Sequence, residues 1–277
     1  MRPYVVAGGT AIVTGAASGI GEALSQALAA RGSHLVLLDR DEPRLTALAH
    51  TLRSGHPGLR VGTLVVDLAD RAATAAAGAR LAAEHPETTL LVNNAGVALG
   101  GAFEQLTLEE FDWLMDVNFR AVVTLTHHLL PVLRSHPGSH LANVSSTYGI
   151  VAAAGQSAYV SSKFAVRGFT EALRHELAGA VGVTCVHPGG IATNIAASAR
   201  IGARVDPVQA EAGRAASAAL LTIPPAAAAE QILRGIERRR PRVLIGWATA
   251  RVPDVLARVA PGSYGTALRL VARRRRR

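Results

Sequence analysis

The sequence contains little of several residue types that often mark a function class. Its 277 residues include one cysteine, Cys185, which excludes an internal disulfide and a cysteine-rich metal site. His127 and His128 are adjacent and would point different ways on a helix, so we expect no metal site. Aromatic residues make up only 4%, so Ala, Val, Leu and Ile must fill most of the core. Lys163 is the only lysine among 29 basic residues.

The chain also lacks a long apolar segment. Residues 1–21 show no charged stretch followed by an apolar one, so we expect no signal peptide. The longest weakly polar run, residues 215–229, is rich in alanine and interrupted by Pro224 and Pro225, which argues against a membrane span. With a single cysteine, these features favour a cytoplasmic protein.

The formal net charge of +9 is concentrated at the C-terminal end. From Arg234 onward 13 arginines stand against Glu237 and Asp254, whereas residues 1–233 carry 16 basic and 18 acidic groups. The last five residues are all arginine. Such an end can attract anionic lipid or nucleic acid, but a solvated terminus gives the same pattern. We favour the solvated terminus, expect no nucleic-acid partner, and keep a peripheral membrane contact of the Arg-rich tail as the alternative.

Apolar runs of the β type alternate with helical patterns along the chain. The runs are mostly continuous, as in parallel strands that are covered on both faces. The predicted strands are 10–15, 34–39, 60–67, 89–96, 139–146, 182–190 and 242–246. The predicted helices are 19–31, 42–54, 70–85, 107–134, 157–179 and 225–240. This order predicts an α/β fold with a doubly wound sheet of about seven parallel strands and helices on both faces.

A glycine-rich loop joins the first predicted strand to the first helix. Residues 14–21 read TGAASGIG, with Gly15, Gly19 and Gly21 in the spacing G-x-x-x-G-x-G and with Ser18 and Ile20 between them. Without side chains at these positions, the main chain can approach a pyrophosphate at the helix N-terminus. The loop therefore predicts a dinucleotide site.

Five further motifs test this prediction. They are NNAG at 93–96, DVNF at 116–119, NVSSTYG at 143–149, YVSSK at 159–163 and HPGGIAT at 187–193. Together with the glycine loop they resemble the short-chain dehydrogenase/reductase family, in its single-domain oxidoreductase branch, over nearly the whole chain. The closer similarity to an acetoin-dehydrogenase-like bacterial subgroup is too broad to fix a substrate. The resemblance implies a Rossmann-type fold and NAD(P)-dependent interconversion of a secondary alcohol and a ketone.

Tyr159 and Lys163 stand one helical turn apart, so their side chains leave the same face. A free phenol has a pKa of about 10, and a neighbouring ammonium stabilises its anion. The compact ammonium can hold ribose hydroxyls where a planar guanidinium would not fit. The resemblance implies that Tyr159 is the general acid/base, that Ser146 binds the substrate oxygen, and that Asn118 holds a water against the lysine. Ser145 is then a structural neighbour.

Asp39, at the end of the second predicted strand, bears on the choice of cofactor. A carboxylate there accepts hydrogen bonds from a ribose 2′-hydroxyl and repels a 2′-phosphate, so NAD is favoured. NADP stays possible because Arg40 follows. By resemblance Asp67 binds the adenine, although a helix N-cap is the alternative. The other implied cofactor contacts are Leu68, Asn93, Asn94, Ala95, Gly96, Tyr159, Lys163, Pro188, Gly189, Ile191 and Thr193; His187 is expected to pack or hydrogen-bond.

The segments 97–103, 147–156 and 191–222 are expected to line the substrate pocket. They are mostly small and apolar, with Tyr148 and Gln156 as polar groups, which favours a small uncharged carbonyl or alcohol substrate. Arg200 and Arg204, within 191–222, would meet a carboxylate or face water. Residues 191–222 are longer than a usual connection, and such insertions often build or cover a site.

We therefore expect a dinucleotide-binding catalytic domain at 1–246, with a substrate-loop insertion at about 191–222, and a basic C-terminal extension at 247–277. The resemblance implies a homotetramer or dimer with the helices around 107–134 and 157–179 at the interface. The alternative function is a dinucleotide-binding sensor without turnover. Such proteins typically lose the tyrosine or the lysine, whereas here Tyr159 and Lys163 are both present.

Overall fold

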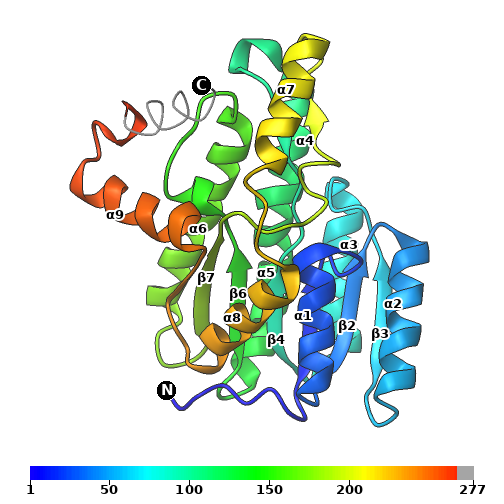
Figure 1. Ribbon diagram of the computed structural model, residues 1–277. Helices are drawn as coiled ribbons and strands as arrows, with labels where there is room; N and C mark the ends of the chain where they lie inside the picture. Colours follow the sequence, from blue (N-terminus) through cyan, green and yellow to red (C-terminus); the bar gives the residue numbers. More distant parts are fainter. Residues whose placement is uncertain (267–277) are drawn as a thin grey trace.

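A parallel sheet forms the centre of the protein in the computed structural model, which describes residues 1–266 (Figure 1). The described part contains a seven-stranded sheet in the order β3-β2-β1-β4-β6-β7-β9, with every neighbouring pair parallel. The strands are β1 (Thr10–Thr14), β2 (His34–Asp39), β3 (Val61–Val65), β4 (Thr88–Asn93), β6 (His140–Val144), β7 (Gly182–Pro188) and β9 (Arg242–Ile245). The predicted doubly wound fold is confirmed.

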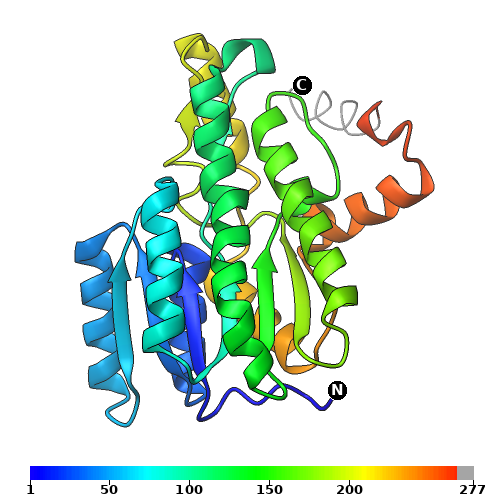
Figure 2. The ribbon, with the colours of Figure 1, turned by 180° about the vertical axis from the view of Figure 1, so that it is seen from behind.

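Helices cover both faces of this sheet. One layer holds α1 (Gly19–Ala30), α2 (Glu42–Gly55) and α8 (Pro225–Glu237), whose buried side chains pack with those of β1 and β2. The other layer holds α3 (Arg71–Glu84), α5 (Ala121–Ser135) and α6 (Ser157–Glu176), which Figure 2 shows from behind. Asp41 and Asp70 begin α2 and α3 by accepting main-chain hydrogen bonds, as N-cap residues do.

The helix predicted at 107–134 is interrupted. Its first part is α4 (Leu108–Met115), which a Thr107–Glu110 capping box begins, and its second part is α5. Between them lies a π-helical turn, η2 (Asp116–Arg120). A π-turn inserts one extra residue into a helix and often stands at a functional site. Here the inserted turn carries Asn118.

The insertion at 191–222 has secondary structure that the sequence did not predict. It contains a short strand, β8 (Arg200–Ile201), and α7 (Pro207–Ala218). The strand β8 pairs in parallel with β5 (Leu99–Gly100), which follows β4. Two 3₁₀ turns, η1 (Phe103–Gln105) and η3 (Thr147–Gly149), lie in other connections. The pairing fixes the insertion over the carboxyl ends of the central strands.

The part of the C-terminal extension that the structure describes is also helical. A π-turn, η4 (Trp247–Arg251), leads into α9 (Val252–Val259), which projects from the body beside α6 in Figure 1. The arginine-rich residues 267–277 lie outside the described residues. None of the helices in residues 1–266 is both long enough and apolar enough to cross a membrane.

Candidate active site

The sequence-predicted site residues gather at one edge of the sheet. Parallel strands bring their carboxyl ends together, and ligands of such sheets bind in the crevice outside those ends. The strand ends that meet here are Thr14 of β1, Asp39 of β2, Asn93 of β4, Val144 of β6 and Pro188 of β7. From β1 the chain adds β2 and β3 on one side of the sheet, and from β4 it adds the later strands on the other side. The strand order therefore reverses between β1 and β4, which is the usual place for such a crevice.

The glycine loop is shaped as a close-packed cradle. Gly15 and Gly19 have positive φ angles of 64° and 56°, which side-chain-bearing residues rarely adopt. A Cβ atom on Gly21 would lie 1.9 Å from the Gly15 carbonyl oxygen. The Ser18 side chain makes no capping hydrogen bond, so the N-terminal amides of α1 are free of a side-chain cap. A Cβ on Gly19 would meet Thr193, which brings the loop after β7 to the same place.

This close packing predicts the effect of adding one methyl group to the loop. We expect Gly21→Ala to weaken NADH binding about ten- to one-hundredfold, because the Gly15 main chain must shift to accommodate the Cβ. Gly168→Ala is the matched control, since no atom lies within 4 Å of its Cβ position. A fluorescence titration compares the two; equal affinities would contradict the assignment of the loop.

Two aspartates fix the loops beside the cradle. The Asp39 carboxylate accepts hydrogen bonds from the main-chain N–H of Ala17, at 2.9 Å, and of Asp41, at 3.1 Å. It therefore ties the end of β2 to the glycine loop. Asp67 accepts from the N–H of Ala69 at 2.9 Å, and the N-cap of α3 is Asp70 instead. The alternative that Asp67 is a helix cap is therefore wrong.

A cavity of about 870 Å³ lies beside these aspartates. Its wall includes Arg40, Asp41, Val66 and Asp67, with residues of α3 on the far side. Leu68 follows on the same loop and is buried. The cavity carries both signs of charge and adjoins the strand ends where the adenine side of a dinucleotide is expected.

Thr14 organises the loop after β4, a role that sequence reasoning missed. Its hydroxyl accepts hydrogen bonds from the N–H groups of Asn94 and Ala95, both at 3.0 Å. The Asn94 amide donates back to the carbonyl oxygens of Thr14 and Gly15. These bonds hold residues 94–96 against the glycine loop. A threonine that ends a buried strand gives no distinctive signal in a single sequence.

Tyr159 and Ser146 meet at the centre of the site. The Tyr159 hydroxyl lies close to the Ser146 side chain, and its ring packs edge-on against Tyr148 with the centroids 6.0 Å apart. Burial raises the pKa of Tyr159 to about 12, which outweighs the lowering by Ser146. The Ser146 hydroxyl also accepts from the N–H of Tyr148 at 3.1 Å. The phenol is therefore protonated at neutral pH.

Lys163 lies beneath this tyrosine and is only 3% exposed. Its Nζ donates to the Val144 carbonyl oxygen at 3.1 Å and lies 5.7 Å from the centroid of the Tyr159 ring. Burial lowers the pKa of the ammonium from its ordinary value of 10.5 to about 8. Burial sets the direction of the Tyr159 pKa shift, and the stabilisation of the tyrosinate by Lys163 stays a prediction.

The buried ammonium predicts a pH-dependent stability. Burying the charged ammonium destabilises the folded state. Between pH 8 and pH 10.5 the unfolded chain binds more protons at Lys163 than the folded chain does. The destabilisation is therefore complete below pH 8 and disappears above pH 10.5. The pKa difference corresponds to about 3 kcal/mol. We expect Lys163→Met to raise the free energy of unfolding at pH 7 by about 2 kcal/mol, since Val144 loses its donor. Urea unfolding at pH 7 and pH 10 measures both proteins; a difference that is independent of pH would contradict this account.

Asn118 is fully buried in the π-turn, and its amide binds the main chain of Val97 and the side chain of Ser162. Its Oδ1 accepts from the Val97 N–H at 2.8 Å, and its Nδ2 donates to the Val97 carbonyl oxygen and to the Ser162 hydroxyl. A Cβ atom on Gly96 would lie 3.4 Å from this Oδ1 and 3.3 Å from the Lys163 Nζ. Asn118 and Lys163 therefore flank Gly96, and the extra residue of the π-turn places the amide there.

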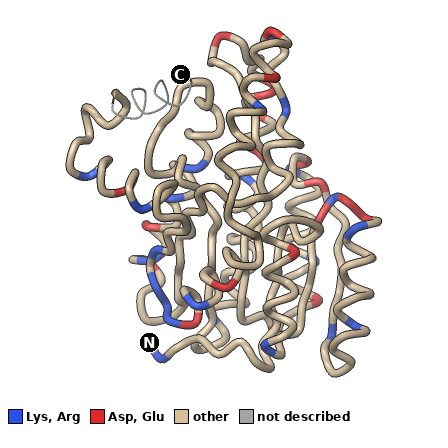
Figure 3. Tube along the Cα trace, in the orientation of Figure 1, with Lys and Arg blue, Asp and Glu red and all other residues tan. Residues whose placement is uncertain are grey.

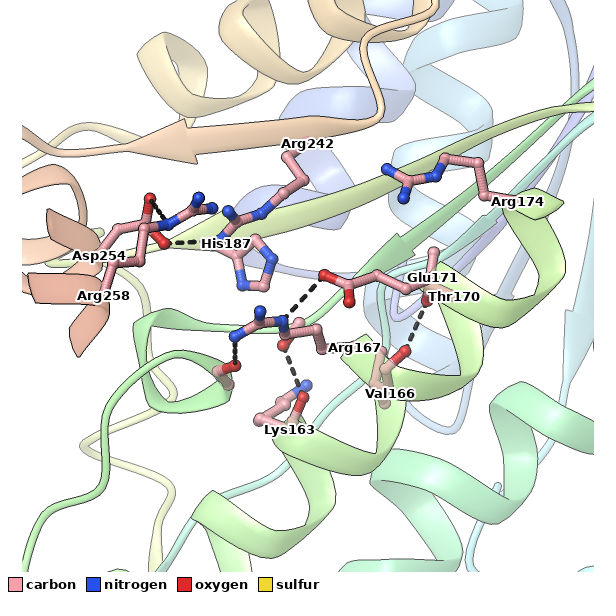
Figure 4. Close-up of polar contacts among 12 residues, drawn as sticks. Lys163, Val166, Arg167, Thr170, Glu171, Arg174, His187, Arg242, Asp254 and Arg258 are labelled. Atoms are coloured by element: carbon pink, nitrogen blue, oxygen red, sulfur yellow. Dashed lines mark hydrogen bonds and ion pairs between the residues drawn. The ribbon is translucent and has the colours of Figure 1, made fainter. Parts of the chain in front are cut away.

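Neighbouring side chains fix the loop that carries Ser146. Ser145 donates to the Lys163 carbonyl oxygen at 2.8 Å, which confirms it as a structural neighbour. His187 donates from Nδ1 to the Ser146 carbonyl oxygen at 3.0 Å, and burial lowers its pKa to about 4. Arg167 pairs with Glu171 at 2.9 Å and donates to the Gly149 carbonyl (Figure 4). The predicted packing and hydrogen-bonding role of His187 is confirmed.

The two arginines of the expected pocket wall each contact a neighbouring residue. The guanidinium of Arg200 stacks 3.7 Å from the centre of the Trp113 ring, and Arg204 donates to the Glu104 carbonyl oxygen. Tyr148 borders Tyr159 on the same side.

The cradle and its surroundings fit a dinucleotide cofactor. A side chain at Gly21 would collide with the Gly15 main chain and the Asn94 amide, so only glycine allows the helix to pack this closely on the loop. The uncapped N-terminus of α1 provides N–H groups for the same anion. Pro188, Gly189, Ile191 and Thr193 continue from β7 along the opposite side. Fold and site together define a dinucleotide-binding α/β protein with a buried tyrosine–lysine pair.

Comparisons with known proteins identify the family. Residues 9–203 match the family model of the short chain dehydrogenases. SadH of Mycobacterium tuberculosis is 38% identical over 261 residues, which cover 93% of this chain and 92% of that protein. Oxidoreductase UcpA of Escherichia coli is 35% identical over 69% of this chain and 72% of its own. The chain belongs to the short-chain dehydrogenase/reductase family and is an NAD(P)-dependent oxidoreductase.

Solved structures agree with this assignment. A short-chain dehydrogenase/reductase from Burkholderia phymatum in complex with NAD superposes with a TM-score of 0.80, at 28% identity and over 96% of both chains. A short-chain dehydrogenase from Sphingobium yanoikuyae in complex with NADPH gives a TM-score of 0.75, at 29% identity and over 95% of both chains. Relatives of this fold thus bind either nicotinamide cofactor.

Proposed function

We propose that the protein interconverts a secondary alcohol and a ketone, with NAD as the preferred cofactor. The observation that carries the proposal is the buried Tyr159 hydroxyl, which lies close to Ser146, with the Lys163 ammonium 5.7 Å from the centre of the tyrosine ring. A protonated phenol can donate its proton to a carbonyl oxygen. A site that only binds dinucleotide needs no such proton donor.

Each side chain of the site has its own role in the reaction. When bound, the nicotinamide supplies or accepts the hydride. Ser146 holds the substrate oxygen by a hydrogen bond, and Tyr159 gives that oxygen its proton during reduction or takes it during oxidation. Lys163, beneath the ring, supplies positive charge that favours the tyrosinate as it forms. Asn118 fixes the Gly96 segment beside the ammonium through its bonds to Val97.

Ketone reduction needs the protonated phenol and alcohol oxidation needs the tyrosinate, so the protonation state of Tyr159 decides which reaction is faster at neutral pH. Because burial keeps Tyr159 protonated, ketone reduction starts from the form that already predominates. Alcohol oxidation needs the tyrosinate, which the positive charges of Lys163 and of an oxidised nicotinamide favour. We therefore infer that reduction is the faster direction at neutral pH, and that oxidation gains as pH rises.

The preference for NAD rests on Asp39. Its carboxylate is held at the end of β2 by the N–H groups of Ala17 and Asp41, so it cannot turn away from the ribose side of the glycine loop without losing both bonds. A 2′-phosphate would meet this negative charge directly, whereas a ribose hydroxyl can donate to it. The adjacent Arg40 lies on the wall of the mixed-charge cavity rather than in the loop.

Replacing this carboxylate should change the cofactor preference. We expect Asp39→Ala to raise the ratio of kcat/KM for NADPH to that for NADH by about tenfold or more, because a like-charge repulsion is removed. Asp41→Ala is the control, since that carboxylate caps α2 instead. An unchanged ratio in Asp39→Ala would show that another residue selects the cofactor.

For assembly and location we retain the expectations from sequence. We propose a homotetramer or dimer whose interface includes the α4–η2–α5 segment and α6. The single buried cysteine supports a cytoplasmic setting. A small uncharged carbonyl or alcohol is the proposed substrate, in keeping with the apolar wall.

A fluorescence titration followed by a turnover assay tests the proposal. NADH and NADPH are titrated first, and coenzyme oxidation is then followed with ketones of graded size at neutral pH. Tight NADH binding with turnover that depends on ketone size supports the proposed reaction. Tight binding without turnover on the whole series would support the sensor function instead.

A further inference from the structure

Helix α9 presents an apolar face that no described residue covers. Val252, Val255 and Val259 occur at helical spacing and share one side of the helix. Val255 is 58% exposed and Val259 79%, and Trp247, in the preceding π-turn, is 73% exposed. In Figure 1 this helix stands away from the sheet, on the side opposite α2 and α3. An exposed tryptophan next to three exposed valines marks an interaction surface rather than part of the core.

A basic groove runs beside this face. It has a volume of about 730 Å³ and lies between α8, β9 and α9, with Trp247, Val252 and Val255 on its wall. One carboxylate, Asp254, also lines it, against five arginines: Arg234, Arg238, Arg240, Arg242 and Arg251. Figure 3 shows basic positions gathered along this end of the chain. The cavity beside Asp67, by contrast, carries both signs of charge.

Most of this positive charge is not neutralised by the protein. The side chains of Arg238, Arg240 and Arg251 are exposed and form no ion pair within residues 1–266. Arg234 has only a long contact of 3.9 Å with Glu230. An anion at the groove would therefore find free guanidinium groups rather than occupied ones.

The apolar face is held in place against the body. Asp254 pairs with Arg242 of β9 at 2.8 Å, with both side chains largely buried, and also binds Arg258 at 3.3 Å (Figure 4). Pro253 and Ala250, on the inner side of the segment, are buried. The segment is therefore anchored through its inner side, and its valines and tryptophan are presented outward in a fixed arrangement.

Two occupants fit an apolar ridge of this kind, a second copy of the chain or a lipid surface. A symmetric contact between two copies would bring the same arginines of both subunits together, and such like charges repel. An anionic bilayer supplies the opposite charge for the groove and an interfacial layer for the tryptophan and valines. Charge complementarity therefore favours the bilayer.

We propose that α9, Trp247 and the neighbouring arginines form a docking surface for an anionic lipid bilayer. The chain binds at the interface without spanning the membrane, the valines and the indole enter the headgroup boundary, and the arginines contact the lipid phosphates. This property is separate from the oxidoreductase chemistry and does not depend on it. All residues of this surface lie within 1–266, and the arginines of 267–277 are not part of it.

Vesicle sedimentation of the full chain tests the proposal. Vesicles of phosphatidylcholine mixed equally with phosphatidylglycerol are compared with vesicles of phosphatidylcholine alone, and all variants keep residues 267–277. Wild-type protein should pellet with the mixed vesicles. The variant Arg238→Gln/Arg240→Gln/Arg251→Gln should lose about one-hundredfold in partitioning, because each arginine near an anionic surface contributes about fivefold. Trp247→Ser/Val255→Ser should lose about tenfold or more.

Matched variants elsewhere provide the controls. Val208→Ser removes a valine of α7 that is 78% exposed. Arg120→Gln/Arg134→Gln/Arg2→Gln removes three exposed arginines that form no ion pair within the described chain. Both controls should partition like wild type, and thermal unfolding verifies that every variant is folded.

Three results would overturn the proposal. The first is wild-type protein that fails to bind the mixed vesicles. The second is binding that the groove and ridge variants do not weaken, since the terminal arginines would then account for all of it. The third is a change of oligomeric state in Trp247→Ser/Val255→Ser, measured by analytical ultracentrifugation without lipid, because a second copy would then cover the ridge.

Discussion

Replacing Tyr159 by phenylalanine should lower ketone turnover by about a thousandfold while leaving NADH affinity within a few-fold of wild type. The substitution removes only the hydroxyl, which lies close to Ser146. The ring keeps its edge-on contact with Tyr148, so the pocket wall is preserved. Steady-state rates and a fluorescence titration of the same preparation separate the loss of proton transfer from any loss of binding.

Tyr148→Phe is the matched control for this prediction. Its ring packs against Tyr159 at 6.0 Å, and it is partly buried in the same wall, but its hydroxyl is not assigned to proton transfer. We expect its turnover to fall by less than about tenfold. Comparable losses in the two variants, or wild-type rates in Tyr159→Phe, would contradict the role assigned to Tyr159.

The second large effect concerns Lys163, which is the only lysine in the sequence; all other Lys/Arg positions are arginine. Lys163→Arg keeps the positive charge, yet we expect kcat/KM to fall by about one-hundredfold or more. The ammonium fits between the Val144 carbonyl and Gly96, and a Cβ on Gly96 would already lie 3.3 Å from it. A guanidinium is larger and planar, so it must displace one of these segments.

Arg167→Lys makes the reverse exchange one helical turn further along α6. Arg167 is partly exposed, pairs with Glu171 and donates to the Gly149 carbonyl oxygen; a lysine ammonium can donate to the same groups, so this variant should keep activity within a few-fold. A Lys163→Arg enzyme with full activity would show that charge alone matters at this position. Similar losses in both variants would point to a general effect on α6 instead.

Much of the fold and the arrangement of the site follow from local sequence patterns. Continuous apolar runs such as residues 34–39 predicted buried parallel strands, and β2 spans the same residues. The motifs at strand ends predicted which side chains meet, because parallel strands align their carboxyl ends. Asp39, Ser146 and Tyr159 accordingly lie at one edge of the sheet.

The features that could not be predicted depend on contacts between distant segments. The π-turn around Asn118 leaves the periodicity of 107–134 almost unchanged, since it adds a single residue to a helix. The pairing of β5 with β8 involves two residues on each strand, too few for a pattern. The high pKa of Tyr159 is a consequence of burial, which a spacing of four residues does not encode.

The C-terminal extension also combines a feature that the sequence predicts with one that depends on contacts between distant segments. Its charge was evident from the sequence, but its apolar face depends on how α9 is anchored through Asp254 to Arg242 of β9. Without that ion pair, Val252, Val255 and Val259 are only a short apolar pattern. The structure turns them into a fixed and exposed ridge beside a basic groove.

Transfer of deuterium from NADH labelled at the C4 position of the nicotinamide tests the central claim most directly. The account predicts that a ketone is converted to an alcohol with deuterium on its carbinol carbon, and that Tyr159→Phe forms almost none of this product. Deuterium on the β-carbon of an enone whose carbonyl remains intact would mean reduction of a C=C bond. That result would contradict the assignment of Tyr159 and Lys163 to alcohol–ketone chemistry.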